Sequence, residues 1–305
     1  MDALALQGLF TPPVLALFGL CIGSFLNVVI HRWPLMLERE WRAESAELLG
    51  VAIEPADPLT LSRPASRCPS CGHRIRWHEN IPVLGWLRLR GRCSACKTPI
   101  SPRYPLVEAA CGLLGWAIVE WMVLRLPPDT EAVRGLMIYV ADLALALGLV
   151  AATFIDLEHL YIPDSITLGA TVVGFATASL RPPLTFVEAG IGAVGGFLMV
   201  WLPFDLLYRK IRGRTGMAMG DAKLVMAAGA WFGIAGALCT LVVGAIQGTF
   251  FAIGSMLLTG KVEESDAVEK ERAQILAAIE ALPPEEREKA EAELADDPIF
   301  DESQG

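Results

Sequence analysis

Long runs of apolar residues are the feature that most constrains this chain. Each run approaches the about 20 residues that an α-helix needs to cross the hydrocarbon core of a bilayer. One apolar stretch, from Leu224 to Leu258, is too long for a single ordinary helix and is divided near Gly233 and Gly236. We place the segments at residues 8–30, 105–124, 136–155, 165–180, 185–207, 223–238 and 239–259. The sequence therefore predicts an all-α polytopic membrane protein with about seven transmembrane helices.

Composition and charge agree with a membrane protein and predict its orientation. Only 19% of the residues are charged, against about 25% in ordinary soluble domains. Residues 31–104 carry eleven Arg and one Lys, and residues 209–214 after the fifth run carry four more basic residues. Because basic residues resist translocation, both segments are predicted to be cytoplasmic. Seven spans then place the N-terminus outside and the C-terminus inside.

The apolar and charged segments divide the chain into four parts. Residues 1–30 are predicted to form the first transmembrane helix, residues 31–104 a cytoplasmic module, residues 105–259 a six-helix transmembrane core, and residues 260–305 an acidic cytoplasmic tail. Much of the formal net charge of -9 lies in the tail. We expect the tail to be a solvated helix or a disordered segment.

Four cysteines within the first cytoplasmic segment form two closely spaced pairs. These are Cys68-Pro-Ser-Cys71 and Cys93-Ser-Ala-Cys96. The spacing is typical of a zinc ribbon, in which four thiolates surround one Zn²⁺ and leave no open position for catalysis. Two disulfides are the alternative, but a reducing compartment normally keeps thiols reduced. We predict a structural zinc site in which the nearby His73 and His78 are not ligands.

Two aspartates lie where predicted spans meet the cytoplasm. Asp156 ends the third span and Asp221 opens the sixth, so the predicted topology lets them meet. Two neighbouring carboxylates do not ionise together easily, so one keeps a proton and acts as an acid while the other activates water. This pattern indicates aspartic peptidase chemistry at the membrane edge.

Other acids within or beside the spans compete for a functional role: Glu108, Glu120, Asp142, Glu188 and Asp205. Asp142 precedes Asp156 by fourteen residues, which is about 21 Å along a helix, so we expect it near the opposite half of the membrane. Depth does not separate Asp205 and Glu108 from the pair. An ion-coupled carrier would depend on acids near the midplane, and a non-enzymatic assembly platform would need neither aspartate.

Three motifs follow one another within residues 20–235: Gly23-Ser24-Phe25-Leu26-Asn27-Val28-Val29-Ile30 with Arg32 and Pro34, the double Cys-x-x-Cys segment, and the two aspartate motifs. In this order they resemble the type IV prepilin peptidase family. On physical grounds, Ser24 and Asn27 are expected to hydrogen-bond to a neighbouring helix. The resemblance implies that Asp156 and Asp221 are the catalytic pair and that Asp164 is a supporting residue.

The resemblance also implies a substrate and a second activity. Members of this family remove the short basic leader from prepilins and from the pseudopilins of type II secretion, in the bacterial cytoplasmic (inner) membrane. Many also methylate the new N-terminus with S-adenosylmethionine, for which no binding residue is assigned here. A peptidase without methyltransferase activity is the alternative. Membrane lipid is an expected partner, nucleic acid is not, and the oligomeric state and the precursor remain open.

Three further residues near the aspartates are expected to support the site. Glu158, with Asp156 and Asp164, gives a locally acidic surface that we expect to attract a basic leader. Gly220 would let the backbone approach closely beside Asp221, and Lys223 follows two residues later. The family commonly has Gly-x-Gly-Asp at this place, whereas this chain has Ala218-Met219-Gly220-Asp221.

Overall fold

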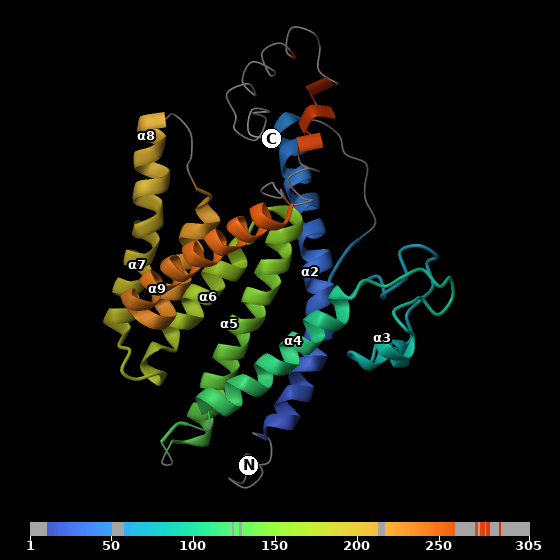
Figure 1. Ribbon diagram of the computed structural model, residues 1–305, viewed down its shortest axis with the longest axis horizontal. Coiled ribbons are helices and arrows are strands. Elements are labelled where there is room, and N and C mark those ends of the chain that lie inside the picture. Colours follow the sequence, from blue (N-terminus) through green and yellow to red (C-terminus); the bar gives the residue numbers. More distant parts are fainter. Residues whose placement is uncertain are drawn as a thin grey trace.

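The computed structural model describes residues 11–50, 58–123, 125–127, 130–212, 217–259, 272, 273, 275–277, 279, 280 and 287. Figure 1 shows a bundle of helices with a small loop-rich module on one flank. The predicted acidic tail, residues 260–305, lies almost entirely outside the described residues. The elements are α2 (Pro12–Leu49), η1 (Trp77–Glu79), α3 (Leu84–Arg88), α4 (Arg103–Ile118), η2 (Val119–Val123), α5 (Ala132–His159), α6 (Asp164–Ala176), η3 (Ala178–Leu180), α7 (Phe186–Val200), η4 (Trp201–Leu207), α8 (Tyr208–Arg212) and α9 (Met219–Thr259).

Several of these helices are suited by length and composition to a bilayer. Four candidate spans are Pro12–Leu48, Ala132–His159, Phe186–Ile211 and Met219–Leu258. The apolar helix α6 is shorter, with 13 residues, and α4 has 16 residues before its π-helical extension η2. The all-α membrane fold is therefore confirmed, whereas the number of seven spans stays a prediction.

The first helix extends well beyond its predicted end at residue 30. α2 continues through Pro34 to Leu49 and ends at Gly50, whose left-handed φ of 66° terminates the helix. The added turns are rich in Glu, Arg, Ala and Leu, which favour helix in water as well as in lipid. The predicted boundary between the first helix and the cytoplasmic module at residue 31 consequently falls inside a continuous helix.

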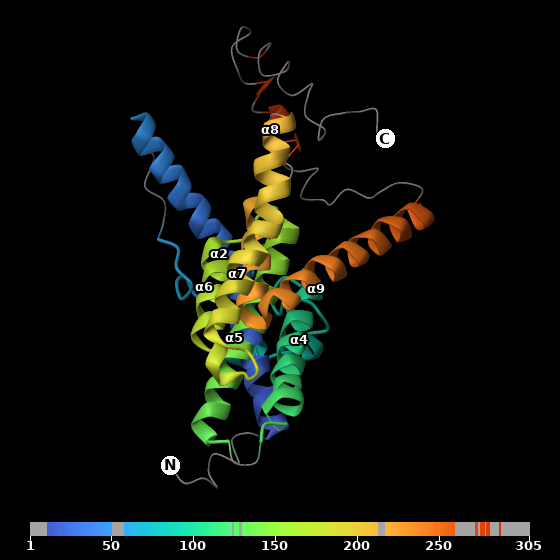
Figure 2. The same cartoon turned by 90° about the vertical axis from the view of Figure 1, so that its left-hand side faces the viewer.

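The long apolar stretch predicted to hold two spans bends at one residue. Gly233 has φ 68° and ψ -172°, which interrupts α9 and which residues with a side chain rarely adopt. The predicted division at residues 238 and 239 thus lies a few residues beyond the actual break. Figure 2 shows the second part of α9 leaving the bundle at an angle to the first.

Close glycine contacts hold α9 against α7. A Cβ added at Gly229 would overlap the backbone of Gly192, and one added at Gly196 would lie 2.6 Å from Val225 O. Small residues permit such close approach, which stabilises helix pairs where lipid supplies no hydrophobic driving force. These contacts fix the first part of α9, which carries Asp221.

The motif at the first span packs α2 against α4. A Cβ added at Gly23 would lie 2.8 Å from Glu108 Cα, so only glycine fits this contact. The Asn27 Nδ2 donates a hydrogen bond to Tyr104 O at 3.1 Å. The expected hydrogen bond from this motif to a neighbouring helix is therefore confirmed for Asn27.

Arg181, in the loop after α6, connects three helices. Its Nη1 donates to Trp231 O on α9 at 2.9 Å, and its Nη2 donates to Gly174 O on α6 at 2.7 Å. Its guanidinium carbon lies 4.2 Å from the centroid of the Trp231 ring, and its charge interacts with Asp142 on α5. Because Gly233 interrupts α9 close to Trp231, Arg181 satisfies a carbonyl at a helix break within the membrane protein.

We expect Arg181→Gln to destabilise the bundle by about 2 kcal/mol, because it removes charged hydrogen bonds to two helices and leaves Asp142 without its cation. Fluorescence-detected thermal unfolding in detergent measures the effect. Arg134→Gln is the matched control, since the Arg134 side chain donates to the single carbonyl of Leu180. Equal decreases in Tm for the two variants would contradict a special role for Arg181.

Candidate active site and metal-binding module

Asp156 and Asp221 come together from two helices. Asp156 lies in the last turn of α5, which ends at His159 because Leu160 adopts a left-handed φ of 56°. Asp221 lies in the first turn of α9, and α5 ends at the same end of the bundle where α9 begins (Figure 1). The two carboxylates lie close enough for their charges to interact. The structure thus brings the predicted pair together, and its catalytic role stays a prediction.

The two aspartates have no ion-pair partner within the described ranges of the chain. The Asp156 side chain is exposed and Asp221 is half-buried. Two neighbouring carboxyl groups without a cation between them can share one proton. Such a pair can donate a proton from one oxygen and accept one at another, which is what acid–base hydrolysis of a peptide needs.

Most of the competing acids already contact a compensating group. Glu120 is an exposed residue of η2. The charge of Arg181 acts on Asp142 without a direct contact, and Asp142 Oδ2 is buried with no hydrogen-bond partner among the described residues. The acids that contact a compensating group are Glu108 with the Val83 N–H, Glu188 with the Thr185 N–H and hydroxyl, and Asp205 with Arg209.

Asp164 and Lys223 form an ion pair that joins α6 to α9. Lys223 Nζ lies 2.6 Å from Asp164 Oδ1. Asp164 is the first residue of α6, directly after Pro163, and Lys223 lies one turn into α9, two residues after Asp221. The two predicted supporting residues therefore meet and link the helix that carries Asp221 to its neighbour, a pairing that their sequence positions did not reveal.

Glu158 and Gly220 are placed differently from what the sequence suggested. Glu158 forms an ion pair with Arg103 at the start of α4, so its charge is compensated, which weakens the expectation that it attracts a basic leader. A Cβ added at Gly220 would lie 3.5 Å from Ile162 Cβ, an ordinary contact. Close backbone packing therefore does not explain Gly220 in this structure, and its supporting role stays a prediction.

The extension of α2 packs beside the end of α5, near Asp156. Glu38 Oε1 lies 3.5 Å from His159 Nδ1, and the rings of Trp41 and Tyr161 meet edge to face with centroids 5.4 Å apart. The sequence prediction missed these neighbours because it ended the first helix where the apolar run ends. The signal that could have found them is the uninterrupted run of helix-favouring residues after Pro34.

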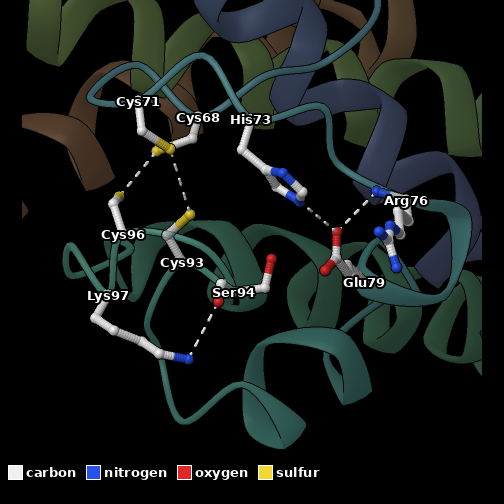
Figure 3. A network of polar contacts seen from close by, with 9 residues as sticks. All are labelled: Cys68, Cys71, His73, Arg76, Glu79, Cys93, Ser94, Cys96 and Lys97. Carbon is white, nitrogen blue, oxygen red and sulfur yellow. Dashed lines mark hydrogen bonds and ion pairs between the residues drawn. The ribbon is translucent and has the colours of Figure 1, made fainter.

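The two cysteine pairs form matching turns. In each turn, the N–H of the first cysteine, Cys68 or Cys93, donates to a carbonyl five residues later at 2.9 Å. The residue after each second cysteine is left-handed: Gly72 has φ 69° and Lys97 has φ 61°. The two turns face each other across the sulfur atoms (Figure 3). The module thus repeats one local geometry twice, as expected for a zinc-ribbon-like fold.

The four sulfur atoms fit a tetrahedral metal ion. All lie within 4.8 Å of one another, with Cys68 Sγ 3.8 Å from Cys96 Sγ and Cys71 Sγ 4.0 Å from Cys93 Sγ. Zn–S bonds of about 2.3 Å in a tetrahedron separate the sulfur atoms by about 3.8 Å. The predicted four-cysteine cluster is confirmed.

The histidines near the sulfur atoms contact other groups. His73 points toward Glu79 in Figure 3, with Nε2 3.6 Å from Glu79 Oε2. The Arg76 N–H donates to the same carboxylate at 2.8 Å and holds the pKa of Glu79 below its usual value. The ring of His78 meets that of Trp77 edge to face. These contacts agree with a metal site made of cysteines alone.

Two family models match the chain. A model described as the bacterial peptidase A24 N-terminal domain matches residues 17–122, and one described as the type IV leader peptidase family matches residues 143–253. No solved structure matches the chain. The first matched range contains the four cysteines, and the second contains both aspartates.

The similarity to curated relatives extends over most of the chain. Prepilin leader peptidase/N-methyltransferase of Stutzerimonas stutzeri is 41% identical over 248 residues, which cover 81% of both chains. The relative of the same name from Aeromonas hydrophila is 42% identical over 79% of this chain and 80% of the relative, and that from Neisseria gonorrhoeae is 36% identical over 86% and 88%. With this coverage and both halves matched, the chain belongs to the prepilin leader peptidase/N-methyltransferase family.

Proposed function

We propose that the chain is a membrane aspartic endopeptidase that removes the basic leader of type IV prepilins and type II secretion pseudopilins and methylates the new N-terminus. The observation that carries the peptidase proposal is the meeting of Asp156 and Asp221, without a compensating cation among the described residues, at the ends of two apolar helices. The activities in the names of its relatives support both halves of the proposal.

The aspartate pair suffices for the hydrolytic step. The ionised carboxylate takes a proton from water while the water oxygen bonds to the scissile carbonyl carbon, and the protonated carboxyl gives its proton to the carbonyl oxygen. In the second step, the first carboxyl protonates the amide nitrogen and the C–N bond breaks. At the same time, one hydroxyl of the tetrahedral intermediate gives its proton back to the carboxylate that protonated the carbonyl oxygen. The products are a new carboxylic acid and a new amine, and the two aspartates regain their starting protonation states.

The position of the pair suits a substrate with one polar and one apolar part. A prepilin presents a basic leader followed by an apolar helix, so a bond between them lies at the bilayer surface. We propose that the module and the C-terminal tail face the cytoplasm and the N-terminus lies outside, in the bacterial inner membrane, because the segments rich in Arg and Lys adjoin the same helix ends.

Methylation is proposed from family membership alone. S-adenosylmethionine would supply the methyl group that the new amine accepts. The described part of the module has isolated bridges between Arg67 and Arg74 and between Arg92 and Pro99, and no strand followed by a glycine-rich turn and a helix. These residues do not fit a nucleotide-binding loop of that type, so none is assigned to the methyl donor.

We expect Asp156→Asn and Asp221→Asn each to lower the rate of prepilin cleavage by at least about 100-fold, because each removes an acid or a base from the reaction. Cleavage of a membrane-embedded prepilin by purified enzyme measures the loss. Asp142→Asn is the control for an acid outside the pair, and the folded variant should cleave prepilin at the wild-type rate. Full activity of Asp156→Asn and Asp221→Asn, together with loss of cleavage activity in Asp142→Asn, would contradict the proposed site.

The Lys223–Asp164 pair should act as one unit in positioning Asp221. We expect Lys223→Gln and Asp164→Asn each to lower kcat/KM by about threefold, a small effect because a partly exposed ion pair contributes about 1 kcal/mol or less. The double variant should be little worse than either single variant, because each single substitution already removes the pair. A double-mutant cycle on prepilin cleavage, with a Tm for each variant, measures the coupling. Independent effects that simply multiply would show that the pair does not position the site.

We propose that the four cysteines hold one structural zinc ion, which no step of the cleavage uses. Their thiolates would fill all four positions around the ion, and its charge would stabilise the two facing turns. Cys68 and Cys96 would then be held by the same ion as Cys71 and Cys93, which would fix the chain between α2 and α4.

Purified protein should contain about one zinc per chain, and Cys93→Ser should lose it, because three thiolates bind the ion far more weakly than four. Elemental analysis gives the metal content, and thermal unfolding shows the lost stability. Cys239→Ser, in α9, is the control and should keep the metal. Zinc-free wild-type protein with an unchanged Tm after chelation would contradict a structural ion.

A further inference from the structure

The part of the module around α3 exposes large apolar side chains. Trp77, Leu84 and Leu87 have exposed fractions of 80%, 63% and 56%. Leu84 and Leu87 are three residues apart on α3 and therefore share a side of it, and η1, which carries Trp77, contacts α3. Exposed apolar side chains gathered in this way mark an interaction surface. We call Trp77, Leu84, Leu87 and the exposed Arg88 and Arg90 the α3 surface.

Hydrogen bonds place the start of α3 at the depth of the transmembrane helices. The Val83 N–H donates to Glu108 Oε2 on α4 at 2.7 Å, and the same carboxylate interacts with the Ser24 hydroxyl on α2. Ser24 precedes Arg32, the first Arg or Lys of α2, by eight residues, or about 12 Å along the helix axis. The chain next to Leu84 therefore lies beside an apolar part of α2, well inside its charged end.

The overall arrangement agrees with this depth. In Figure 1, α3 lies on the flank of the bundle beside α2 and α4, and not beyond the end of the bundle where α2 projects. A segment on that flank faces outward at the level of helices that cross the membrane. If the helices span a bilayer, its outward side chains therefore meet lipid. This inference does not depend on a catalytic role of the aspartates.

The charge of the module favours an anionic lipid surface. Residues 58–103 contain nine basic residues and one acidic residue, Glu79. Each basic residue close to an anionic leaflet strengthens its attraction to that leaflet. Basic residues alone would only orient the chain in the membrane. Here they adjoin exposed Leu and Trp side chains, and this combination is typical of segments that lie in a membrane interface.

We propose that the α3 surface inserts into the adjacent leaflet of the bilayer, with Leu84 and Leu87 among the acyl chains and Arg88 and Arg90 at anionic headgroups. The module is then held by lipid on this side and by the hydrogen bond from the Val83 N–H to Glu108 on the other. Its cysteine turns would keep a fixed height above the membrane, instead of moving freely at the end of a linker.

The test uses full-length protein in nanodiscs that contain phosphatidylglycerol with brominated acyl chains. Leu84→Trp should add fluorescence that these lipids quench at least about twofold more than the fluorescence added by Ala65→Trp. Ala65 is an exposed residue of the same module outside the α3 surface. Leu87→Trp repeats the measurement in case Leu84→Trp fails to fold. Replacing Arg88 and Arg90 by Gln should reduce the quenching in anionic nanodiscs more than in phosphatidylcholine alone.

Equal quenching of the indoles introduced at positions 84 and 65 would overturn the proposal. So would an indole at position 84 that stays unquenched by lipid but is shielded when a prepilin is added, because that result would assign the α3 surface to the substrate. Quenching that is the same with and without Arg88 and Arg90 would overturn the anionic part of the proposal.

Discussion

The structure depends on the cost of a charge that is surrounded by lipid. An ionisable group between transmembrane helices needs a partner inside the protein, because no water is present to solvate it. Two acids of the helical core meet this need directly, because Asp205 pairs with Arg209 and Glu108 accepts a hydrogen bond from the Val83 N–H. Asp142 has only the more distant charge of Arg181. Asp156 and Asp221 stand apart, because their charges interact and neither has an ion-pair partner among the residues that the structure describes. An uncompensated pair persists only at a helix end that water can reach.

The framework that brings these aspartates together is built from small residues and buried polar contacts. Lipid surrounds apolar side chains as favourably as neighbouring helices do, so helix pairs need close packing and hydrogen bonds. Gly192 and Gly229 let α7 and α9 touch backbone to backbone, and Arg181 holds α9 near its break at Gly233. These contacts hold the first part of α9, which carries Asp221, in place within the bundle.

The sequence predicted best what depends on local spacing or on alternation of spans. The two Cys-x-x-Cys pairs each fix two sulfur atoms locally, and spans that alternate in direction place Asp156 and Asp221 at one face. Pairs such as Arg103 with Glu158 were not predictable, because they depend on how each helix is rotated against its neighbours. The extension of α2 was missed for a different reason: its last turns follow helix propensity in water, whereas the prediction followed the apolar run.

These contacts also connect the cysteine module to the aspartates, although the two lie on different parts of the chain. α4 begins seven residues after Cys96, and its first residue, Arg103, pairs with Glu158, two residues from Asp156. The next residue, Tyr104, accepts a hydrogen bond from Asn27 on α2. The proposed ion, by fixing the two cysteine turns, would therefore also fix the start of α4, and through it the last turn of α5. A metal that takes no part in hydrolysis would in this way define the position of one of the two carboxylates.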